Sequence, residues 1–134
     1  MQNVAPLLLA SCLSLPASAR AVEPGNWELS LVTMMTGQQK PAAVTQQRCL
    51  TESDARDPSN VLGGSQGGTC NFTNRNDNGR TFTFDVACTG VLPMKGKGTV
   101  NYTAQTMDAD LDLVAEKGEF GMRTFVKGRR LGPC

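Results

Sequence analysis

The chain has 134 residues, a formal net charge of +1 and no histidine. Lack of histidine excludes Ser-His-Asp and Cys-His catalysis and removes the commonest metal ligand. The balanced charge, with no patch of one sign along the sequence, argues against nucleic acid or an anionic membrane as a partner.

The first 21 residues are predicted to be a signal peptide. Residues 4–15 are mostly apolar, and this run is too short to span a bilayer. Small residues follow at the spacing that signal peptidase reads, which favours cleavage after Ala21 and a mature chain beginning at Val22. Removal of residues 1–21 takes away one cation, Arg20, and leaves 12 basic and 12 acidic residues. Residues 22–134 are expected to form a single domain.

The leader also contains a lipobox-like sequence, Leu9-Ala10-Ser11-Cys12, in which Cys12 would be cleaved and lipidated. The apolar run continues past Cys12, whereas a lipobox normally ends such a run. Soluble export to the periplasm or the medium is therefore favoured, and membrane attachment is expected only if Cys12 carries lipid.

The dominant pattern after residue 24 is alternation with period two, which is typical of strands. A first strand around Trp27 has one mostly apolar face, and a second is expected over residues 44–50. Thr51 and Asp54 have the spacing of a capping box, which predicts a short helix that Pro58 ends.

The remaining chain predicts a loop followed by five strands. Residues 60–69 are rich in Gly and Ser and are expected to form a loop. A hairpin is predicted around Asn78-Gly79, whose residues favour the positive φ of a tight turn. The predicted strands are residues 71–75, 80–88, 98–106, 107–115 and 120–128.

The fold class that these elements predict is all-β. We expect an antiparallel meander of six to eight strands that forms a curled sheet, a half-barrel or a barrel, with one short helix.

Four cysteines remain after the leader: Cys49, Cys70, Cys88 and Cys134. An even set in a short exported chain predicts two structural disulfides. The spacings contain no Cys-x-x-Cys, so a zinc ribbon or a redox motif is not expected. Three pairings are open, and we predict the sequential one, Cys49 with Cys70 and Cys88 with Cys134.

Asp108, Asp110 and Asp112 raise the question of a calcium site or a carboxylate enzyme. An EF-hand needs glycine at its sixth position, where this chain has Leu113. The alternating leucines indicate instead a strand with a solvated acidic face. We therefore expect no catalytic residues, no metal site and no cofactor.

Several segments, in order and spacing, resemble the domain of unknown function 3617 family of exported bacterial proteins. The resemblance covers residues 24–134 and implies a periplasmic, all-β, cysteine-bridged domain with no assigned activity. The matching segments are Pro24-Gly25-Asn26-Trp27-Glu28, Arg48-Cys49-Leu50-Thr51 with Asp54-Ala55, Cys70, Ala87-Cys88-Thr89-Gly90, Gly96-Lys97-Gly98-Thr99 and Gly128-Arg129-Arg130-Leu131-Gly132-Pro133-Cys134.

The C-terminal motif has a structural interpretation and a functional one. Gly128 is expected to break the last strand, and Gly132-Pro133 to turn the chain so that Cys134 reaches its partner. Arg129 and Arg130 are either solvated charges, which we favour, or a docking patch for a carboxylate or phosphate.

Together these features predict an exported, non-catalytic binding or accessory module of the bacterial envelope, whose partner is an unidentified envelope protein or small ligand. The alternatives are a small-ligand carrier with an apolar cavity inside the curled sheet, a lipoprotein anchored through Cys12, and, last, a carboxylate or metal enzyme.

Overall fold

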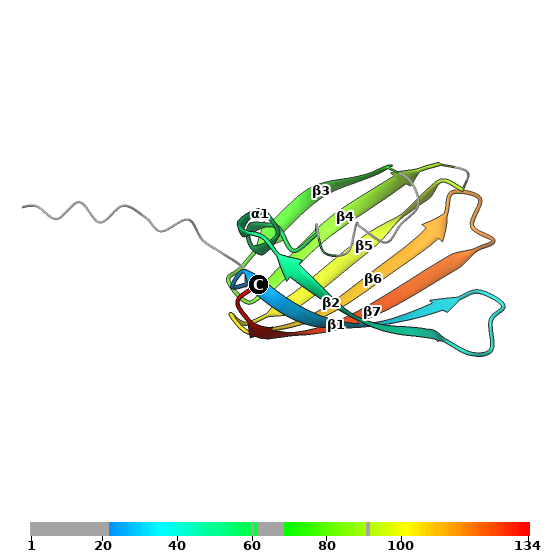
Figure 1. Ribbon diagram of the computed structural model, residues 1–134. Helices are drawn as coiled ribbons and strands as arrows, with labels where there is room; N and C mark the ends of the chain where they lie inside the picture. Colours follow the sequence, from blue (N-terminus) through cyan, green and yellow to red (C-terminus); the bar gives the residue numbers. More distant parts are fainter. Residues whose placement is uncertain (1–21, 60, 62–68, 91) are drawn as a thin grey trace, which may run out of the picture.

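The computed structural model describes residues 22–59, 61, 69–90 and 92–134. Seven strands form one curled antiparallel sheet, and a short helix lies at one end of it (Figure 1). The predicted leader, Cys12 and most of the predicted 60–69 loop lie outside the described residues. In chain order the elements are β1 (Gly25–Met35), β2 (Ala42–Leu50), α1 (Glu52–Arg56), β3 (Thr69–Asp77), β4 (Thr81–Thr89), β5 (Met94–Tyr102), β6 (Thr106–Ala115) and β7 (Gly121–Gly132).

The strand order across the sheet is β2-β1-β7-β6-β5-β4-β3, with every neighbouring pair antiparallel. Strands β3 to β7 form the predicted meander, and the last strand then pairs with the first. The all-β prediction of six to eight strands is confirmed, and the sheet is open, with β2 and β3 at its edges. In the described part of the chain, no helix is long and apolar enough to span a bilayer.

The sheet has an apolar inner face because its strands alternate with period two. The burial of β6 alternates along its whole length, and Trp27 on β1 is fully buried, as the pattern predicted. Phe82, Phe84 and Val86, at alternate positions of β4, are also buried. The largest fully buried side chains are Trp27, Leu29, Leu50, Met107, Leu113, Val22, Val100 and Val126, with Pro58 and Ser59.

Helix α1 lies at one end of the curled sheet, beside the end of β3 (Figure 1). The predicted capping box is confirmed: Asp54 N–H donates to Thr51 Oγ1, and Thr51 N–H donates back to the Asp54 carboxylate at 3.0 Å. Asp57, just after the helix, forms an ion pair with Arg75 of β3 at 3.3 Å. This pair connects the helix to the edge of the sheet farthest from β2.

Strands β5 and β7 differ most from their predicted bounds. Strand β5 begins at Met94 rather than residue 98. The sequence did not predict this earlier start because the inner positions Gly96 and Gly98 give no apolar alternation. Strand β7 continues through Gly128 to Gly132, so the expected break at Gly128 is wrong. A Cβ at Gly128 would lie 2.9 Å from Met107 and 3.0 Å from Leu29, so glycine here makes room for the core rather than ending the strand.

The predicted disulfide pairing is wrong. The bonds join Cys49 to Cys134 and Cys70 to Cys88. Cys70 and Cys88 are directly opposite each other on β3 and β4. Pairing of Cys49 with Cys70 would require β2 and β3, the opposite edges of the sheet, to meet. Strand order, which local spacing does not encode, therefore decides the connectivity.

Candidate binding site on the outer face

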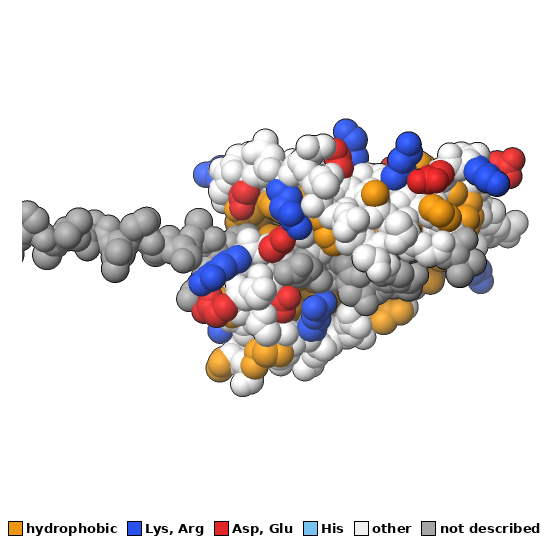
Figure 2. Space-filling view, turned by 90° about the horizontal axis from the view of Figure 1, so that it is seen from above, with side chains coloured by type: hydrophobic (Ala, Val, Ile, Leu, Met, Phe, Trp, Pro, Cys, Tyr) orange, Lys and Arg blue, Asp and Glu red, His pale blue; other side chains and the backbone are white. Residues whose placement is uncertain are grey.

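Charged side chains on the outer face alternate in sign from strand to strand. Asp85 lies on β4, lysines on β5, aspartates on β6, cations on β7 and Glu28 on β1. Opposite charges therefore face each other across neighbouring strands, which stabilises this register. Acidic and basic side chains are also interspersed on the side of the molecule seen in Figure 2.

Several of these outer carboxylates are held in ion pairs. Arg123 binds Asp110 through two hydrogen bonds of 3.1 and 2.6 Å, and Asp110 raises the pKa of Arg123 above its usual value. The Arg123 guanidinium also lies 4.8 Å from the centre of the Phe125 ring. Glu28 pairs with Arg129 at 3.0 Å, and Asp85 with Lys97 at 4.0 Å.

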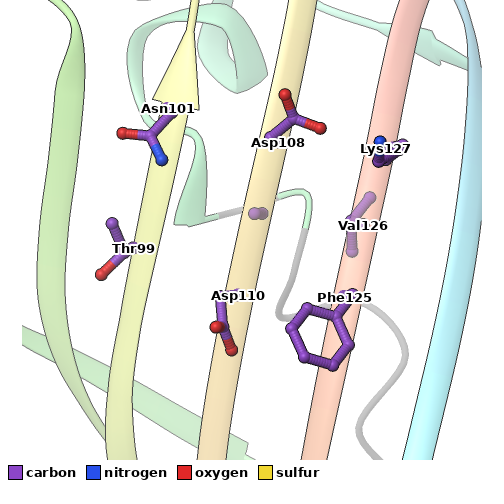
Figure 3. A pocket seen from close by; sticks show the side chains of 8 residues that line it. Thr99, Asn101, Asp108, Asp110, Phe125, Val126 and Lys127 are labelled. Atoms are coloured by element: carbon purple, nitrogen blue, oxygen red, sulfur yellow. The ribbon is translucent and has the colours of Figure 1, made fainter.

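Asp108 differs from these carboxylates, because three shallow grooves of the outer face meet at it. Among the described residues it has no ion pair within 4.0 Å. Its direct neighbours across the strands are Asn101 on β5 and Lys127 on β7. Figure 3 shows these three side chains in a row across the first groove, with Thr99, Asp110 and Phe125 in a second row.

The row combines hydrogen-bond acceptors with donors. The Asp108 carboxylate accepts, the Lys127 ammonium donates, and the Asn101 amide can do both. Thr81 already donates to the Asn101 side-chain oxygen at 2.8 Å, which orients the amide and leaves its NH2 for a ligand. The site therefore offers fixed polar groups of both kinds on a rigid sheet.

The three aspartates of β6 do not converge on one point. Asp108, Asp110 and Asp112 occupy alternate positions on one face of a strand, and Arg123 holds the middle one. In the described ranges, no group of three or more His, Cys, Asp or Glu residues is arranged to hold a metal ion.

Arg129 and Arg130 lie on opposite faces of β7. Arg129 points outward to Glu28. Arg130 is partly buried, and its Nε donates to the Pro24 carbonyl at 3.0 Å, with the Glu23 carboxylate at 4.0 Å. They do not share one surface, so docking through the pair as a single patch has no geometric basis, and Arg129 borders a groove next to Asp108.

The comparison with known families matches residues 22–134 to a family described as "Protein of unknown function (DUF3617)". The chain belongs to this family. The match covers all of the chain after the predicted leader. No curated protein and no solved structure matches the chain.

Membership in DUF3617 confirms the resemblance and supplies no activity, so the site must be interpreted from its own geometry. The sequence pattern indicated Asp108 only as one of three aspartates and did not point to Asn101 or Lys127. These lie 7 positions before and 19 after Asp108. No local signal in the sequence gave the strand register that aligns them with Asp108.

In this DUF3617 member one disulfide joins the end of β2 to the C-terminal residue, whose end of the chain is marked in Figure 1, and the other joins the beginning of β3 to the end of β4. Two bonds of this kind are typical of proteins that fold in an oxidising compartment outside the cytoplasm.

Tyr102, at the end of β5, is the only tyrosine of the chain and borders one of the three grooves that meet at Asp108. Burial, together with the hydrogen bond to the Asp77 carboxylate and the charge of that carboxylate, raises the pKa of Tyr102 to about 12. The folded state therefore holds this proton more tightly than the unfolded chain.

A pH dependence follows from this shift. Stability from the Tyr102 hydroxyl is complete below pH 10.0, the ordinary pKa, and is lost as the pH rises toward about 12. Near-ultraviolet absorbance reports this one phenol, and its titration midpoint should lie well above the ordinary value. Asp77→Asn should lower the midpoint only in part, because burial is the larger cause. A midpoint at the ordinary value in the folded protein would contradict the structure.

Proposed function

We propose that this protein is an exported, non-catalytic binding module that recognises a neutral, hydroxyl-rich ligand, such as an oligosaccharide of the cell envelope, on the outer face of its sheet. The disulfides, which fit an oxidising compartment, and the predicted leader support a periplasmic or secreted location.

The observation that carries this proposal is the meeting of three grooves at Asp108, beside Asn101 and Lys127. Asp85, Asp110 and Glu28 are each tied to a neighbouring cation, whereas Asp108, where the grooves meet, keeps its acceptor oxygens for a ligand. A carboxylate that accepts a ligand hydroxyl forms one of the stronger hydrogen bonds available to a protein.

Charge and shape favour a neutral ligand. Asp108 and Lys127 have opposite charges, and the neighbouring pairs Asp110–Arg123 and Glu28–Arg129 are each balanced. A strongly anionic or cationic molecule would meet one attractive and one repulsive group. Sugar hydroxyls both donate and accept, so they suit this mixture. The Phe125 ring, which lies under the Arg123 guanidinium, borders the same groove.

The geometry favours this site over the alternative of a carrier with an apolar cavity. On the inner face, Trp27, Leu29 and Met107 are fully packed, and the Phe84 ring lies over Gly98. Side chains therefore fill the space inside the curled sheet at the end nearest α1, where a carrier would need a cavity. On the outer face the grooves are open to a ligand.

Asp108→Ala should weaken oligosaccharide binding by about tenfold or more, because a hydrogen bond to a charged group contributes about 1.5–3 kcal/mol. Titration calorimetry against a panel of soluble envelope oligosaccharides, including peptidoglycan glycan fragments, would measure this. Asp112→Ala is the matched control, since Asp112 occupies the same face of the same strand and does not border these three grooves.

Equal losses in both aspartate variants, or no binding by any oligosaccharide of the panel, would overturn the proposed ligand class. Mass spectrometry of the protein from the periplasm tests the location: a chain beginning at Val22, with both disulfides formed, is expected. A lipid on Cys12 would assign the protein to the membrane instead.

A further inference from the structure

Strand β2 is a regular strand with one open side. It pairs with β1 without a break from Leu50, opposite Gly25, to Ala42, opposite Thr33. On its other side it has no partner strand among the residues that the structure describes. Residues 42–47 are exposed on both faces. The backbone N–H and C=O groups of this edge can therefore accept another strand.

The two edges of the sheet are protected to different degrees. Strand β3 carries a bulge, with Asn74 at φ +50° and a register shift between Thr73 and Asn76, and it bears the charges of Arg75 and Asp77. Bulges and charges are the usual devices that keep an edge from pairing. Residues 42–47 of β2 have no charge, no proline and no register shift. The sheet thus has one guarded edge and one unguarded edge.

The surfaces beside the unguarded edge are also uncharged. On the outer face Val32 lies between Phe125 and Ala43, and Met34 is 52% exposed. On the inner face Val44 is 58% exposed and lies opposite Leu31. The alternating charges of the outer face do not extend to this segment of β2. A partner on β2 would bury apolar side chains on both of its faces.

We propose that β2 pairs with β2 of a second copy, antiparallel and centred on Thr45, so that the two sheets become one. In this register Thr45 lies opposite its own equivalent, Val44 opposite Gln46, and Ala42 opposite Arg48. Each pair shares a face, as strand pairing requires, and no like charges are opposed. Threonine pairs of this kind stabilise antiparallel strands.

A second copy is the occupant that the asymmetry of the edges favours. Each chain offers one unguarded edge, so pairing two such edges about a two-fold axis closes the assembly as a dimer rather than a fibre. A strand-to-strand contact of this length is smaller than a standard interface, so we expect a dissociation constant in the micromolar range, about 1 to 100 µM.

Sedimentation of the mature, oxidised chain at about 1 to 500 µM tests this proposal. The wild-type mass should rise from monomer to dimer with concentration. Thr45→Lys sets two like charges opposite each other at the two-fold axis and should weaken the dimer at least tenfold. Thr73→Lys, an exposed position on the guarded edge strand, is the matched control and should dimerise as the wild type does. The fluorescence of Trp27, the only tryptophan, checks that both variants are folded.

Hydrogen exchange adds a readout that a general loss of solubility would not change. The amides of residues 42–47 should gain protection as the concentration rises, while those of β3 should not. A monomer at every concentration would overturn the proposal and leave the β2 edge to a strand of another protein. A dimer that Thr45→Lys leaves intact would place the contact elsewhere and would equally overturn it.

Discussion

Replacing Cys49 and Cys134 together by serine is expected to lower the free energy of unfolding by about 4 to 5 kcal/mol. This disulfide joins residues 85 positions apart, so its loss frees a long loop in the unfolded chain. It also holds the edge strand β2 to the end of β7, with β1 between them. A domain of this size has about 5 to 15 kcal/mol in total, so the variant should be close to unfolding.

The second disulfide provides the matched comparison. Cys70 and Cys88 are 18 positions apart and already face each other across a strand pair, so their replacement by serine should cost about 3 kcal/mol. Urea unfolding followed by Trp27 fluorescence would measure both, because this single tryptophan is fully buried. A larger loss for the Cys70–Cys88 pair would contradict the loop-length argument.

Gly96→Ala should destabilise the protein by about 3 kcal/mol or more, at the upper end of overpacking effects. A Cβ at this position would lie 1.7 Å from the carbonyl oxygen of Asp112 on the neighbouring strand β6. The obstacle is backbone, so β5 and β6 would have to separate and lose ladder hydrogen bonds. The loss of glycine therefore disturbs the curl of the sheet itself.

Gly98→Ala, two residues along the same strand, is a control with a different obstacle. Its Cβ would meet the Phe84 ring at 2.1 Å, and a side chain can move where a backbone carbonyl cannot. Gly98→Ala should therefore destabilise the protein less than Gly96→Ala. Phe84→Leu, which makes the neighbouring side chain smaller, should relieve the clash of Gly98→Ala in a double-mutant cycle. The same Phe84→Leu change should not rescue Gly96→Ala. Chemical denaturation of the wild type, the three single variants and the two double variants would show rescue at one glycine only, and rescue at both would refute the geometry.

The two proposals for this protein fail independently. The ligand proposal depends on Asp108, which lies on the outer face near the end of the sheet where α1 lies. The dimer proposal depends on residues 42–47 of β2. A monomer that binds oligosaccharide would support the ligand proposal and contradict the dimer proposal. A dimer that binds no oligosaccharide would do the reverse. Asp108→Ala should leave dimerisation unchanged, and Thr45→Lys should leave ligand binding unchanged.

The sequence by itself determined the local structure of this protein. The alternation along residues 107–115 predicted the inner and outer faces of β6, because side chains of a strand point alternately to its two sides. Thr51 and Asp54 predicted the start of α1, since a capping box acts over three residues. The even number of cysteines predicted two disulfides, and the order of short motifs indicated the family.

Only the tertiary structure decided which strands are neighbours, because pairing depends on contacts between residues far apart in the chain. The adjacency of β1 and β7 carries the last strand past Gly128 and brings Cys134 to Cys49. The same strand order aligns Asn101, Asp108 and Lys127 in one row, although alternation along the sequence assigned only Asp108 to an outer face. It also left β2 at an edge, where an uncharged strand that looks unremarkable in the sequence becomes a surface for pairing.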